Sequence, residues 1–421
     1  MPVVRPPAGG DGPLRILWIK TELLHPVTVG GRIRTYHMLR ELRRRHHVTY
    51  LALDDGAGGA AAIENATEYC HELIRVPVRP ARRGSVRFAL GLAASLTTPL
   101  PYVAYRARSR ELRRALTKRV SHGDIDLVIC DFLFPASNVP DALGVPIVLF
   151  QHNVEAAIWR RHSEVRSNPL ARAFFREQWR RVFRFEGQEC RRFDRVIAVS
   201  DQDRRTMEED YRAERVDAVP TGVDTAFFTA GATSTARPGR LVFTGAMDWL
   251  PNEDAMAYCV DSILPLIRRA MPDAHLTIVG RNPSARVRAL ADGNAAVTVT
   301  GSVPDVRPYL EEASVFVVPL RIGGGTRLKI YEALAMDRAV VSTPIGAEGL
   351  DTVDGETIAI AESPEAFAAS VVRLLRDPAT ATALGKRGGD FVRANYGWER
   401  VSRAFEEICA RTLDEYRRRR R

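Results

Sequence analysis

Short runs of Val, Ile and Leu alternate along this chain with segments of amphipathic, helical pattern, and this alternation limits the fold most strongly. Each run is short and continuously apolar, as expected of parallel strands that are buried on both faces. A first series of runs comprises Leu14–Trp18, Val48–Leu53, Leu127–Cys130, Ile147–Phe150 and Val196–Val199. A second series comprises Leu241–Thr244, Leu276–Val279, Val297–Thr300, Val315–Val318, Val340–Ser342 and Thr357–Ile360. Two such series predict an α/β chain with two doubly wound, Rossmann-like domains.

The seam between the two series is expected at Ala230–Gly239. This segment is rich in Gly, Ser, Thr and Pro and has no apolar periodicity, which is typical of a linker. We therefore expect an N-terminal domain at 1–230, a C-terminal domain at 231–397, and a C-terminal helix with a basic tail at 398–421. The tail ends in five consecutive arginines, Arg417–Arg421, which predict a solvated, disordered end or, as the alternative, added attraction to a membrane.

Composition excludes several classes of protein. Hydrophobic residues make up 45% and charged residues 27% of the 421 residues, which is ordinary for a globular chain and excludes a disordered, collagen-like or polytopic membrane protein. The apolar stretch at 88–104 contains two prolines and is too short to span a bilayer. The five cysteines form no CxxC pair, which argues against a disulfide framework and a cysteine-based zinc site. The cysteine pattern therefore favours a reducing cytoplasm. The start of the chain lacks the apolar core of a signal peptide.

The net charge of +10 is concentrated in one segment. Residues 75–122 contain twelve Lys and Arg residues and a single acid, Glu111. Two interpretations stay open: a solvated helix face, or a surface that contacts an anionic membrane or an anionic acceptor. The segment has no interleaved aromatic residues and no recognisable nucleic-acid module, so no nucleic-acid partner is expected.

The most informative stretch is a glycine-rich turn between an apolar run and a helical pattern. Gly323, Gly324 and Gly325 are followed by Thr326 and then by a helix. Glycines let a backbone approach a ligand closely, and a helix N-terminus offers unpaired N–H groups and a partial positive charge. These features together predict a corner that binds a diphosphate.

Charged residues in the same stretch strengthen this interpretation. Arg327 and Lys329 add positive charge at the corner, and Glu332 follows one turn later, where a carboxylate can accept hydrogen bonds from ribose hydroxyls. The simpler alternative is a glycine turn before an ordinary helix with a surface Lys329–Glu332 pair. The Walker pattern GxxxxGK[ST] is absent, as is GxGxxG after the first strand, which disfavours ATP hydrolysis and NAD binding.

The whole chain resembles the family 4 glycosyltransferases of the exopolysaccharide and sugar-transferase type, which have the GT-B fold. The donor corner and the preceding GSVPDVRPYLEEASVFVVPL carry the resemblance. Further motifs occur in the expected order: Gly30-Gly31, QHNVE at 151–155, FDRVIAVS at 193–200, VPTGVD at 219–224, FTGAMDWLPN at 243–252 and IVGRNP at 278–283. Each motif is moderately specific, and the ordered set is strong.

The resemblance implies a hexosyltransferase (EC 2.4) of polysaccharide biosynthesis. Such an enzyme moves a sugar from a nucleotide-diphosphate sugar, such as a UDP-sugar, to a glycan, lipid-linked or small-molecule acceptor with retention of configuration, and without a metal or other cofactor. Two Rossmann-like domains would face each other across a cleft, with the donor on the C-terminal and the acceptor on the N-terminal domain. The C-terminal helix would return to the N-terminal domain. The location would be cytoplasmic, with membrane contact through residues 75–122.

The resemblance also implies roles for individual residues. His152, Arg327, Lys329 and Glu332 would be catalytic. The donor would be bound by Gly30, Gly31, Gly245, Gly323, Gly324, Gly325, Thr326 and Glu332. His152 would hydrogen-bond the transferred sugar, and a satisfied structural histidine is the alternative. A plain strand–helix turn is the alternative for the Gly30-Gly31 loop, which precedes Arg32 and Arg34.

Other residues are weaker candidates. Glu155 would orient His152, contact the acceptor or cap a helix, and Asn252 is expected to cap the next helix. Asp305 and Arg307 follow GSVP, where the family places the base.

The chain departs from the family pattern at four positions. The first acid of a frequent pair is Gly324, two cations after the first C-terminal strand are replaced by Ala246 and Pro251, and the usual Asn before Gly-Val-Asp is Thr221. Phosphate stabilisation would then fall to Arg327 and Lys329. The departures also keep two alternatives open: a non-catalytic module that binds nucleotide sugars, and a sugar epimerase with the GT-B fold.

Overall fold

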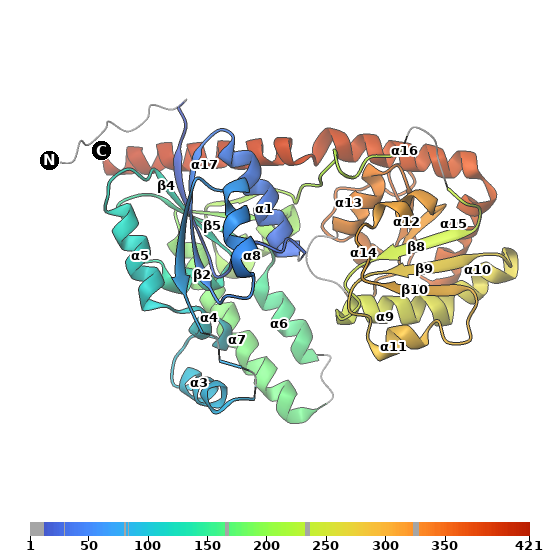
Figure 1. The fold of residues 1–421 in the computed structure, drawn as a ribbon, viewed down its shortest axis with the longest axis horizontal. Helices are drawn as coiled ribbons and strands as arrows, with labels where there is room; N and C mark the ends of the chain where they lie inside the picture. The colour runs from blue at the N-terminus through green and yellow to red at the C-terminus, as the bar shows by residue number, and fades with distance from the viewer. Residues whose placement is uncertain are drawn as a thin grey trace. The chain divides into compact units, whose positions relative to one another are not determined.

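The structure is a computed structural model that describes residues 12–28, 30–79, 81–82, 84–164, 168–231, 236–322 and 328–421. It contains two compact units. The first consists of Met1–Pro220 together with Val401–Arg421, and the second of Thr221–Arg400. Each unit is built around one parallel sheet (Figure 1).

The first unit holds a seven-stranded sheet in the order β3-β2-β1-β4-β5-β6-β7, and all neighbouring strands are parallel. Its strands are β1 Arg15–Lys20, β2 His47–Asp54, β3 Glu72–Pro77, β4 Leu127–Asp131, β5 Ile147–Phe150, β6 Arg195–Ala198 and β7 Val216–Ala218. The order reverses between β1 and β4, so the crossovers run to both sides and helices cover both faces (Figure 1). Leu17, Val128 and Leu149 lie fully buried in the resulting core.

Local sequence explains where several helices of this unit begin. The helical elements are α1 Gly30–Arg43, α2 Gly59–Glu64, η1 Asn65–Glu68, α3 Val86–Leu96, α4 Tyr102–Ala107, α5 Arg110–Val120, η2 Phe134–Asn138, α6 Glu155–Glu164, α7 Pro169–Arg192 and α8 Asp201–Tyr211. Asn168 caps α7 by accepting hydrogen bonds from two backbone N–H groups, and Pro169 occupies the first helical position. Ser200 caps α8 in the same way, with two aspartates in the first turn beside the positive end of the helix dipole.

The second unit holds a six-stranded parallel sheet in the order β10-β9-β8-β11-β12-β13. Its strands are β8 Arg240–Thr244, β9 His275–Val279, β10 Val297–Gly301, β11 Val315–Val318, β12 Ala339–Ser342 and β13 Ala359–Ile360. Its helical elements are α9 Leu250–Tyr258, η3 Cys259–Ile263, α10 Leu264–Ala270, α11 Ala285–Ala289, α12 Arg307–Glu312, α13 Leu328–Ala335, α14 Pro344–Ala347, α15 Pro364–Arg376 and α16 Pro378–Asn395. Phe243, Ile278 and Phe316 are fully buried in its core.

The predicted fold class is confirmed, because both sheets are parallel and doubly wound. All eleven predicted apolar runs contain strand residues, whereas β3 and β7 were not predicted. Both are edge strands. β3 includes Glu72 and Arg75 and is mostly half-exposed, so it lacks a continuous apolar run. β7 is only three residues long.

The C-terminal helix α17, Trp398–Arg420, packs on the first unit from Val401 onward, as the resemblance implied. Phe405 is fully buried, with its ring centroid 5.7 Å from that of Trp18 and 5.0 Å from that of Phe150. Glu406 forms an ion pair with Arg45 at 2.7 Å, and its other carboxylate oxygen lies 2.8 Å from Nε2 of His46. The helix therefore completes the core of the first unit.

The predicted disordered tail is wrong. The helix continues to Arg420, because the arginines find partners on the first unit. Arg419 pairs with Asp194 at 3.1 Å, and Arg420 donates a hydrogen bond to the carbonyl of Gly144.

The predicted domain limits at 230/231 and 397/398 stay a prediction. The compact units divide at Pro220/Thr221 and at Arg400/Val401, and residues 232–235 of the expected linker lie outside the described residues. Within the described ranges, no helix is long and apolar enough to cross a membrane.

We predict that Phe405→Ala lowers the free energy of unfolding of the first unit by about 3–5 kcal/mol, because it leaves a cavity beside two aromatic rings. Phe405→Leu should cost clearly less. Urea unfolding followed by tryptophan fluorescence measures both effects. An alanine variant as stable as the parent chain would contradict the packing role of α17.

Candidate functional site

In each sheet the strand order reverses once, and such switch points are where doubly wound sheets bind ligands. In the first unit the reversal lies between β1 and β4, and in the second between β8 and β11. The carboxyl ends of these strands carry Lys20 and Asp131 in the first unit and Gly245 in the second. Several of the predicted site residues lie at these two places.

The centre of the first cluster is the carboxylate of Asp131, which is completely buried. Its Oδ2 accepts hydrogen bonds from Trp18 Nε1 at 2.9 Å, Lys20 Nζ at 3.0 Å and Thr35 Oγ1 at 2.6 Å. Its Oδ1 lies 2.7 Å from Nε2 of His152. The carboxylate thus joins the ends of β1 and β4, helix α1 and the residue that follows β5. Sequence reasoning missed Asp131, Lys20 and Thr35. For Asp131 and Lys20 the only signal was a charged residue at the end of an apolar run, and Thr35, within α1, had no such signal.

This network determines the charge states of Asp131 and His152. Burial by itself would raise the pKa of Asp131, but the charges of Lys20 and His152 and the hydrogen bonds outweigh it, so the pKa lies well below its usual range. Burial lowers the pKa of His152 to about 4 against the opposing attraction of Asp131, so the imidazole is neutral at pH 7. Because Nε2 of His152 lies 2.7 Å from the Asp131 carboxylate, we assign the proton of the neutral ring to Nε2, which makes Nδ1 the hydrogen-bond acceptor.

The start of α1 lies directly against His152. A Cβ atom added at Gly31 would come within 3.2 Å of the Phe132 ring and 3.7 Å of His152 Nδ1, so a larger residue here would require the Phe132 ring to move by a few tenths of an ångström. Gly30 has open space around it. Phe132 has a positive φ of 78°, which costs about 1–3 kcal/mol for a side chain of this kind and is found mainly at functional sites.

The two arginines near the glycine pair are engaged within the protein. Arg32 pairs with Glu22 at 2.7 Å. Arg34 is buried, and it donates hydrogen bonds to the carbonyls of Gln151 at 3.2 Å and Val219 at 2.7 Å. Burial lowers the pKa of Arg34 to about 9. Arg34 therefore fixes α1 across the carboxyl ends of the strands, and closure of this loop over a donor stays a prediction.

Asp131 lies against Nε2 of His152, and the roles predicted for Glu155 stay predictions. Glu155 begins α6 beside a second buried acid, Glu186 of α7. Glu186 accepts hydrogen bonds from the N–H groups of Glu155 and Ala156, both at 2.9 Å, and from the hydroxyl of Tyr211 at 2.7 Å. Burial and the neighbouring Glu186 raise the pKa of Glu155 to about 8, and burial raises that of Glu186 to about 7.

In the second unit, part of the predicted donor corner lies outside the described residues: Gly323, Gly324, Gly325, Thr326 and Arg327. Helix α13 begins directly after them, and Lys329 lies in its first turn. Lys329 Nζ donates a hydrogen bond to Asn252 Oδ1 at 3.0 Å and lies 3.9 Å from the centroid of the Phe243 ring. The ammonium group is therefore held at the carboxyl end of β8.

Gly245 is required for this arrangement. An added Cβ would lie 2.7 Å from Lys329 Nζ and 2.8 Å from Asn252 Nδ2. The side chain of Asn252 also donates to the carbonyl of Ala246 at 2.9 Å. The prediction that Asn252 caps a helix is wrong: Asn252 lies within α9, whose N-cap is Trp249. Asn252 instead connects the loop after β8 to Lys329, which no local sequence signal could show.

Glu332 lies one turn further along α13 and is partly buried. Burial raises its pKa to about 7, although the charge of Lys329 opposes this. Asp305 and Arg307 form an ion pair with each other at 2.7 Å, and the Arg307 guanidinium stacks on the Phe227 ring at 3.8 Å. In the described part of the chain, no three His, Cys, Asp or Glu side chains form a group that could hold a metal ion.

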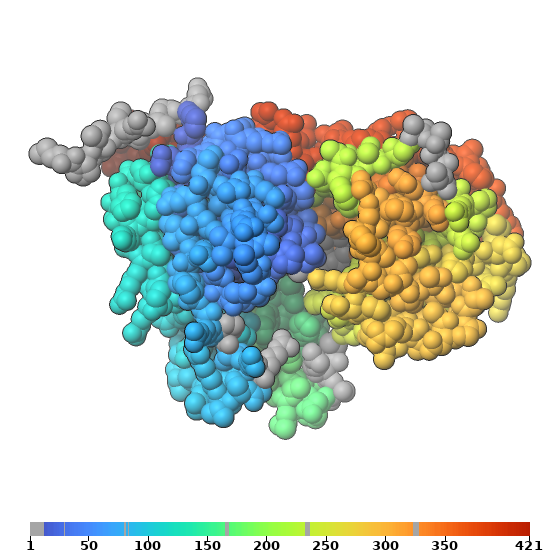
Figure 2. Space-filling model, viewed as in Figure 1, coloured from blue at the N-terminus to red at the C-terminus, as the bar shows by residue number. Residues whose placement is uncertain are grey.

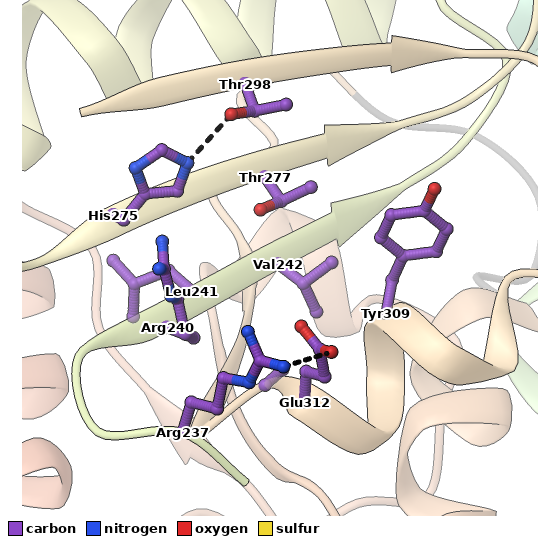
Figure 3. Close-up of a pocket in the computed structure, with 10 residues that line it drawn as sticks. Arg237, Arg240, Leu241, Val242, His275, Thr277, Thr298, Tyr309 and Glu312 are labelled. Carbon is purple, nitrogen blue, oxygen red and sulfur yellow. Dashed lines mark hydrogen bonds and ion pairs between the residues drawn. The ribbon is translucent and has the colours of Figure 1, made fainter. Parts of the chain in front are cut away.

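The second unit also has a hollow of about 230 Å³ at the opposite, amino-terminal edge of its sheet. Figure 3 shows Arg240 of β8, His275 of β9 and Thr298 of β10 on its strand side, with Tyr309 and Glu312 of α12 opposite. Two pairs within it already satisfy each other: His275 with Thr298 and Arg237 with Glu312 (Figure 3). None of the predicted site residues lines this hollow.

Two family models match consecutive parts of the chain. Residues 29–227 match the model "Glycosyltransferase Family 4", and residues 238–377 match "Glycosyl transferases group 1". Together they cover most of the chain, including both clusters described above. The chain belongs to glycosyltransferase family 4. The predicted family is therefore confirmed.

Two of the curated relatives of this chain are named as mannosyltransferases. The lipopolysaccharide core biosynthesis mannosyltransferase LpcC of Rhizobium leguminosarum bv. viciae is 27% identical over 267 residues, covering 59% of this chain and 73% of that protein. The phosphatidyl-myo-inositol mannosyltransferase of Mycobacterium tuberculosis is 31% identical over 166 residues, covering 38% of this chain and 43% of that protein. The alignments span only about half the length of several such relatives.

Solved structures match over nearly the whole glycosyltransferase chain. Sucrose-phosphate synthase from Thermosynechococcus elongatus superposes with a TM-score of 0.69 at 17% identity, covering 94% of this chain and 98% of that one. HepE from Anabaena in complex with UDP and glucose gives a TM-score of 0.65 at 12% identity, with the same coverage of both chains. At this identity the likeness establishes the fold alone.

We predict that Asp131→Asn destabilises the first unit by about 3–5 kcal/mol, because it leaves the buried ammonium of Lys20 without its counter-charge. The double variant Lys20→Met, Asp131→Asn should recover much of the loss, since no unpaired charge then remains. Urea unfolding of the two variants and of Lys20→Met gives the coupling energy. A coupling near zero would show that the pair is not energetically linked.

The acid pair on α6 and α7 predicts a pH dependence of stability. Folding raises the pKa of Glu155 from 4.5 to about 8 and that of Glu186 from 4.5 to about 7, so the folded state holds these protons more tightly. The contribution of the pair to the free energy of unfolding should therefore fall as the pH rises above about 4.5, and level off above about 8. Urea unfolding across this range should give a flatter profile for Glu155→Gln. Equal slopes would contradict the raised pKa values.

Proposed function

We propose that this glycosyltransferase moves a hexose from a nucleotide-diphosphate sugar to an acceptor with retention of anomeric configuration. The donor would be bound by the second unit and the acceptor by the first. The observation that carries the proposal is the ammonium group of Lys329, which Asn252 and Phe243 hold at the switch point of the second sheet. That is the edge at which doubly wound sheets bind nucleotides.

The departing nucleoside diphosphate needs stabilisation of its developing negative charge. Fixed cations and N–H groups in a site that is organised before reaction supply such stabilisation at little further cost. Lys329 is one such cation, and we assign Arg327, Thr326 and the N–H groups of the glycine triplet to the same role. Lys329 lies beside Gly245, immediately before Ala246, where many relatives have a cation. We infer that Lys329 compensates for the cations missing at Ala246 and Pro251.

The other site residues would contact the sugars. Nδ1 of His152 faces Gly31 and can accept a hydrogen bond from a hydroxyl of the transferred sugar, because Asp131 holds the opposite nitrogen. Gly30 and Gly31 would approach the donor by their backbone. Glu332 would accept hydrogen bonds from the ribose hydroxyls in its ionised form. Because its pKa is raised to about 7, this form predominates only above about pH 7.

For the acceptor, we propose a lipid-linked or envelope glycan, as the names of the curated relatives suggest, with a soluble natural product as the alternative. The reaction would take place in the cytoplasm, on the inner membrane face for a lipid-linked acceptor. Gly324, Ala246 and Pro251 favour a second candidate function, a module that binds nucleotide sugars without transfer. A sugar epimerase on the same fold is the third.

Incubation with UDP-, GDP-, ADP- and TDP-sugars tests the proposal. One donor should raise the melting temperature and be hydrolysed slowly in the absence of acceptor. Binding without hydrolysis or transfer across a broad acceptor screen would favour the non-catalytic module. Epimerisation of UDP-N-acetylglucosamine, followed by NMR, would identify an epimerase. A chain that responds to none of these nucleotides would refute the assignment of the corner.

We predict that Lys329→Gln slows donor hydrolysis and transfer by on the order of 10²-fold or more, as for other groups that stabilise transition-state charge. Arg327→Ala should have a similar effect, and Glu332→Ala should mainly weaken nucleotide binding. Asn252→Ala should fall between wild type and Lys329→Gln, because the ammonium loses its anchor.

The matched control is Lys386→Gln, which removes an exposed lysine of α16 that pairs with Asp390 on the same helix. It should leave the rate and donor affinity unchanged. Steady-state kinetics together with thermal melts separates loss of chemistry from loss of fold. Wild-type kinetics in both the Lys329 and the Arg327 variants would mean that the charge stabilisation lies elsewhere.

A further inference from the structure

Helix α3 of the first unit exposes an apolar face to solvent. Val86, Leu90 and Leu96 are 77%, 65% and 54% exposed, and Ala89 and Ala93 between them are exposed as well. Their spacing places all five on one side of the helix. The helix has only one charged residue, Arg87. A contiguous exposed apolar face of this kind usually marks an interaction site.

The opposite side of α3 is packed firmly, so the exposed face has a fixed orientation. The Phe88 ring meets the Tyr102 ring edge-on at 5.7 Å, and Ser95 is completely buried. From α7, Arg181 Nη1 donates hydrogen bonds to the carbonyls of Ser95 and Thr98, both at 2.9 Å. Figures 1 and 2 show α3, in light blue, on the surface of the first unit.

Positive charge surrounds this helix. A hollow of about 990 Å³ beside it is lined by apolar groups of α3 and α4 and by six arginines, with Asp55 as the one acid of its lining. The arginines are Arg79, Arg87, Arg106, Arg108, Arg110 and Arg113. A second hollow, of about 530 Å³, continues along α5 with Arg114 and Lys118.

These arginines differ from other arginines of the same unit. Across the described ranges, none of the six forms an ion pair with an acid. By contrast, Arg119 pairs with both Glu72 and Asp124, and Arg195 with both Asp217 and Glu415. The six are therefore available to bind an external anion.

We propose that α3 and the surrounding arginines dock this enzyme on the surface of an anionic phospholipid bilayer. The apolar face would enter the boundary between head groups and acyl chains, as amphipathic helices do, while the arginines bind the lipid phosphates bidentately. A nucleic acid or an acidic protein would match the charge and leave the apolar face uncovered. The bilayer satisfies both features.

Docking on a bilayer would bring a lipid-linked acceptor to the enzyme, and in this respect the inference rests on the proposed function. Vesicle binding can be measured without any sugar transfer. If the chain hydrolyses a donor but does not bind vesicles, only the docking surface is refuted. If it binds vesicles but responds to no donor, only the proposed transferase function is refuted.

The test is flotation of the full chain with vesicles of pure phosphatidylcholine or of equal parts phosphatidylcholine and phosphatidylglycerol. We expect binding to the anionic vesicles that weakens with added salt. The variant Arg106→Glu, Arg110→Glu, Arg113→Glu should lower the partition coefficient by on the order of 100-fold or more, given the contribution of each basic residue near an anionic surface. Leu90→Glu should lower it by about tenfold or more, because a carboxylate opposes both insertion and charge.

Matched controls carry the same changes elsewhere. Arg205→Glu, Arg286→Glu, Arg418→Glu alters the net charge equally at exposed positions, and Val353→Glu replaces an apolar residue that is 49% exposed in the second unit. Both should bind like wild type. Thermal melts verify folding, and Leu90→Gln provides a milder variant should Leu90→Glu unfold.

Three outcomes would overturn the proposal. The first is equal binding to neutral and anionic vesicles, or no binding to either. The second is wild-type binding by the arginine and Leu90 variants. The third is binding of a dispersed short-chain phosphatidic acid without binding to vesicles, which would indicate a pocket for a single lipid rather than a docking surface.

Discussion

The reversal of strand order in each parallel sheet is the constraint on which the rest of this protein depends. Because βαβ crossover connections are right-handed, the helices that follow β1 and β4, and those that follow β8 and β11, lie on opposite faces of their sheet. The carboxyl ends of these strands are therefore left uncovered by the helices that follow them. Asp131 and Lys329 lie at those two edges, and each is held there by neighbours from other elements. The site thus follows from backbone topology before any side chain is considered.

The charged groups at the centres of the two clusters have different neighbours. In the first unit a buried carboxylate is compensated by Lys20, so its charge is retained inside the protein and serves to position His152. In the second unit the ammonium of Lys329 is held by an amide oxygen of Asn252 and by the face of the Phe243 ring. This difference agrees with a first unit that orients sugar hydroxyls and a second unit that stabilises a diphosphate. The enzyme would then need no rearrangement of charge during transfer.

Much of the fold could be predicted, because buried parallel strands are continuous apolar runs. β4 and β11 are examples: every residue in them is buried. The edge strands β3 and β7 escaped prediction because an edge position requires no such run. Of the site, the motifs indicated Gly31, His152, Gly245 and Lys329. They did not indicate Asp131, whose partner His152 lies 21 residues away in the sequence. Nor did they indicate the true role of Asn252, whose partner Lys329 lies 77 residues away.

The sequence by itself determined the family and the two βα series, because these are local patterns of hydrophobicity, glycine and charge. Only the tertiary structure decided which charges are neutralised and which face outward. It paired Arg119 and Arg195 with acids, ordered the C-terminal arginines on the first unit, and left the six arginines around α3 without ion-pair partners among the described residues. The physical reason is that the energy of a charge depends on burial and on neighbours from distant segments, which no local pattern specifies.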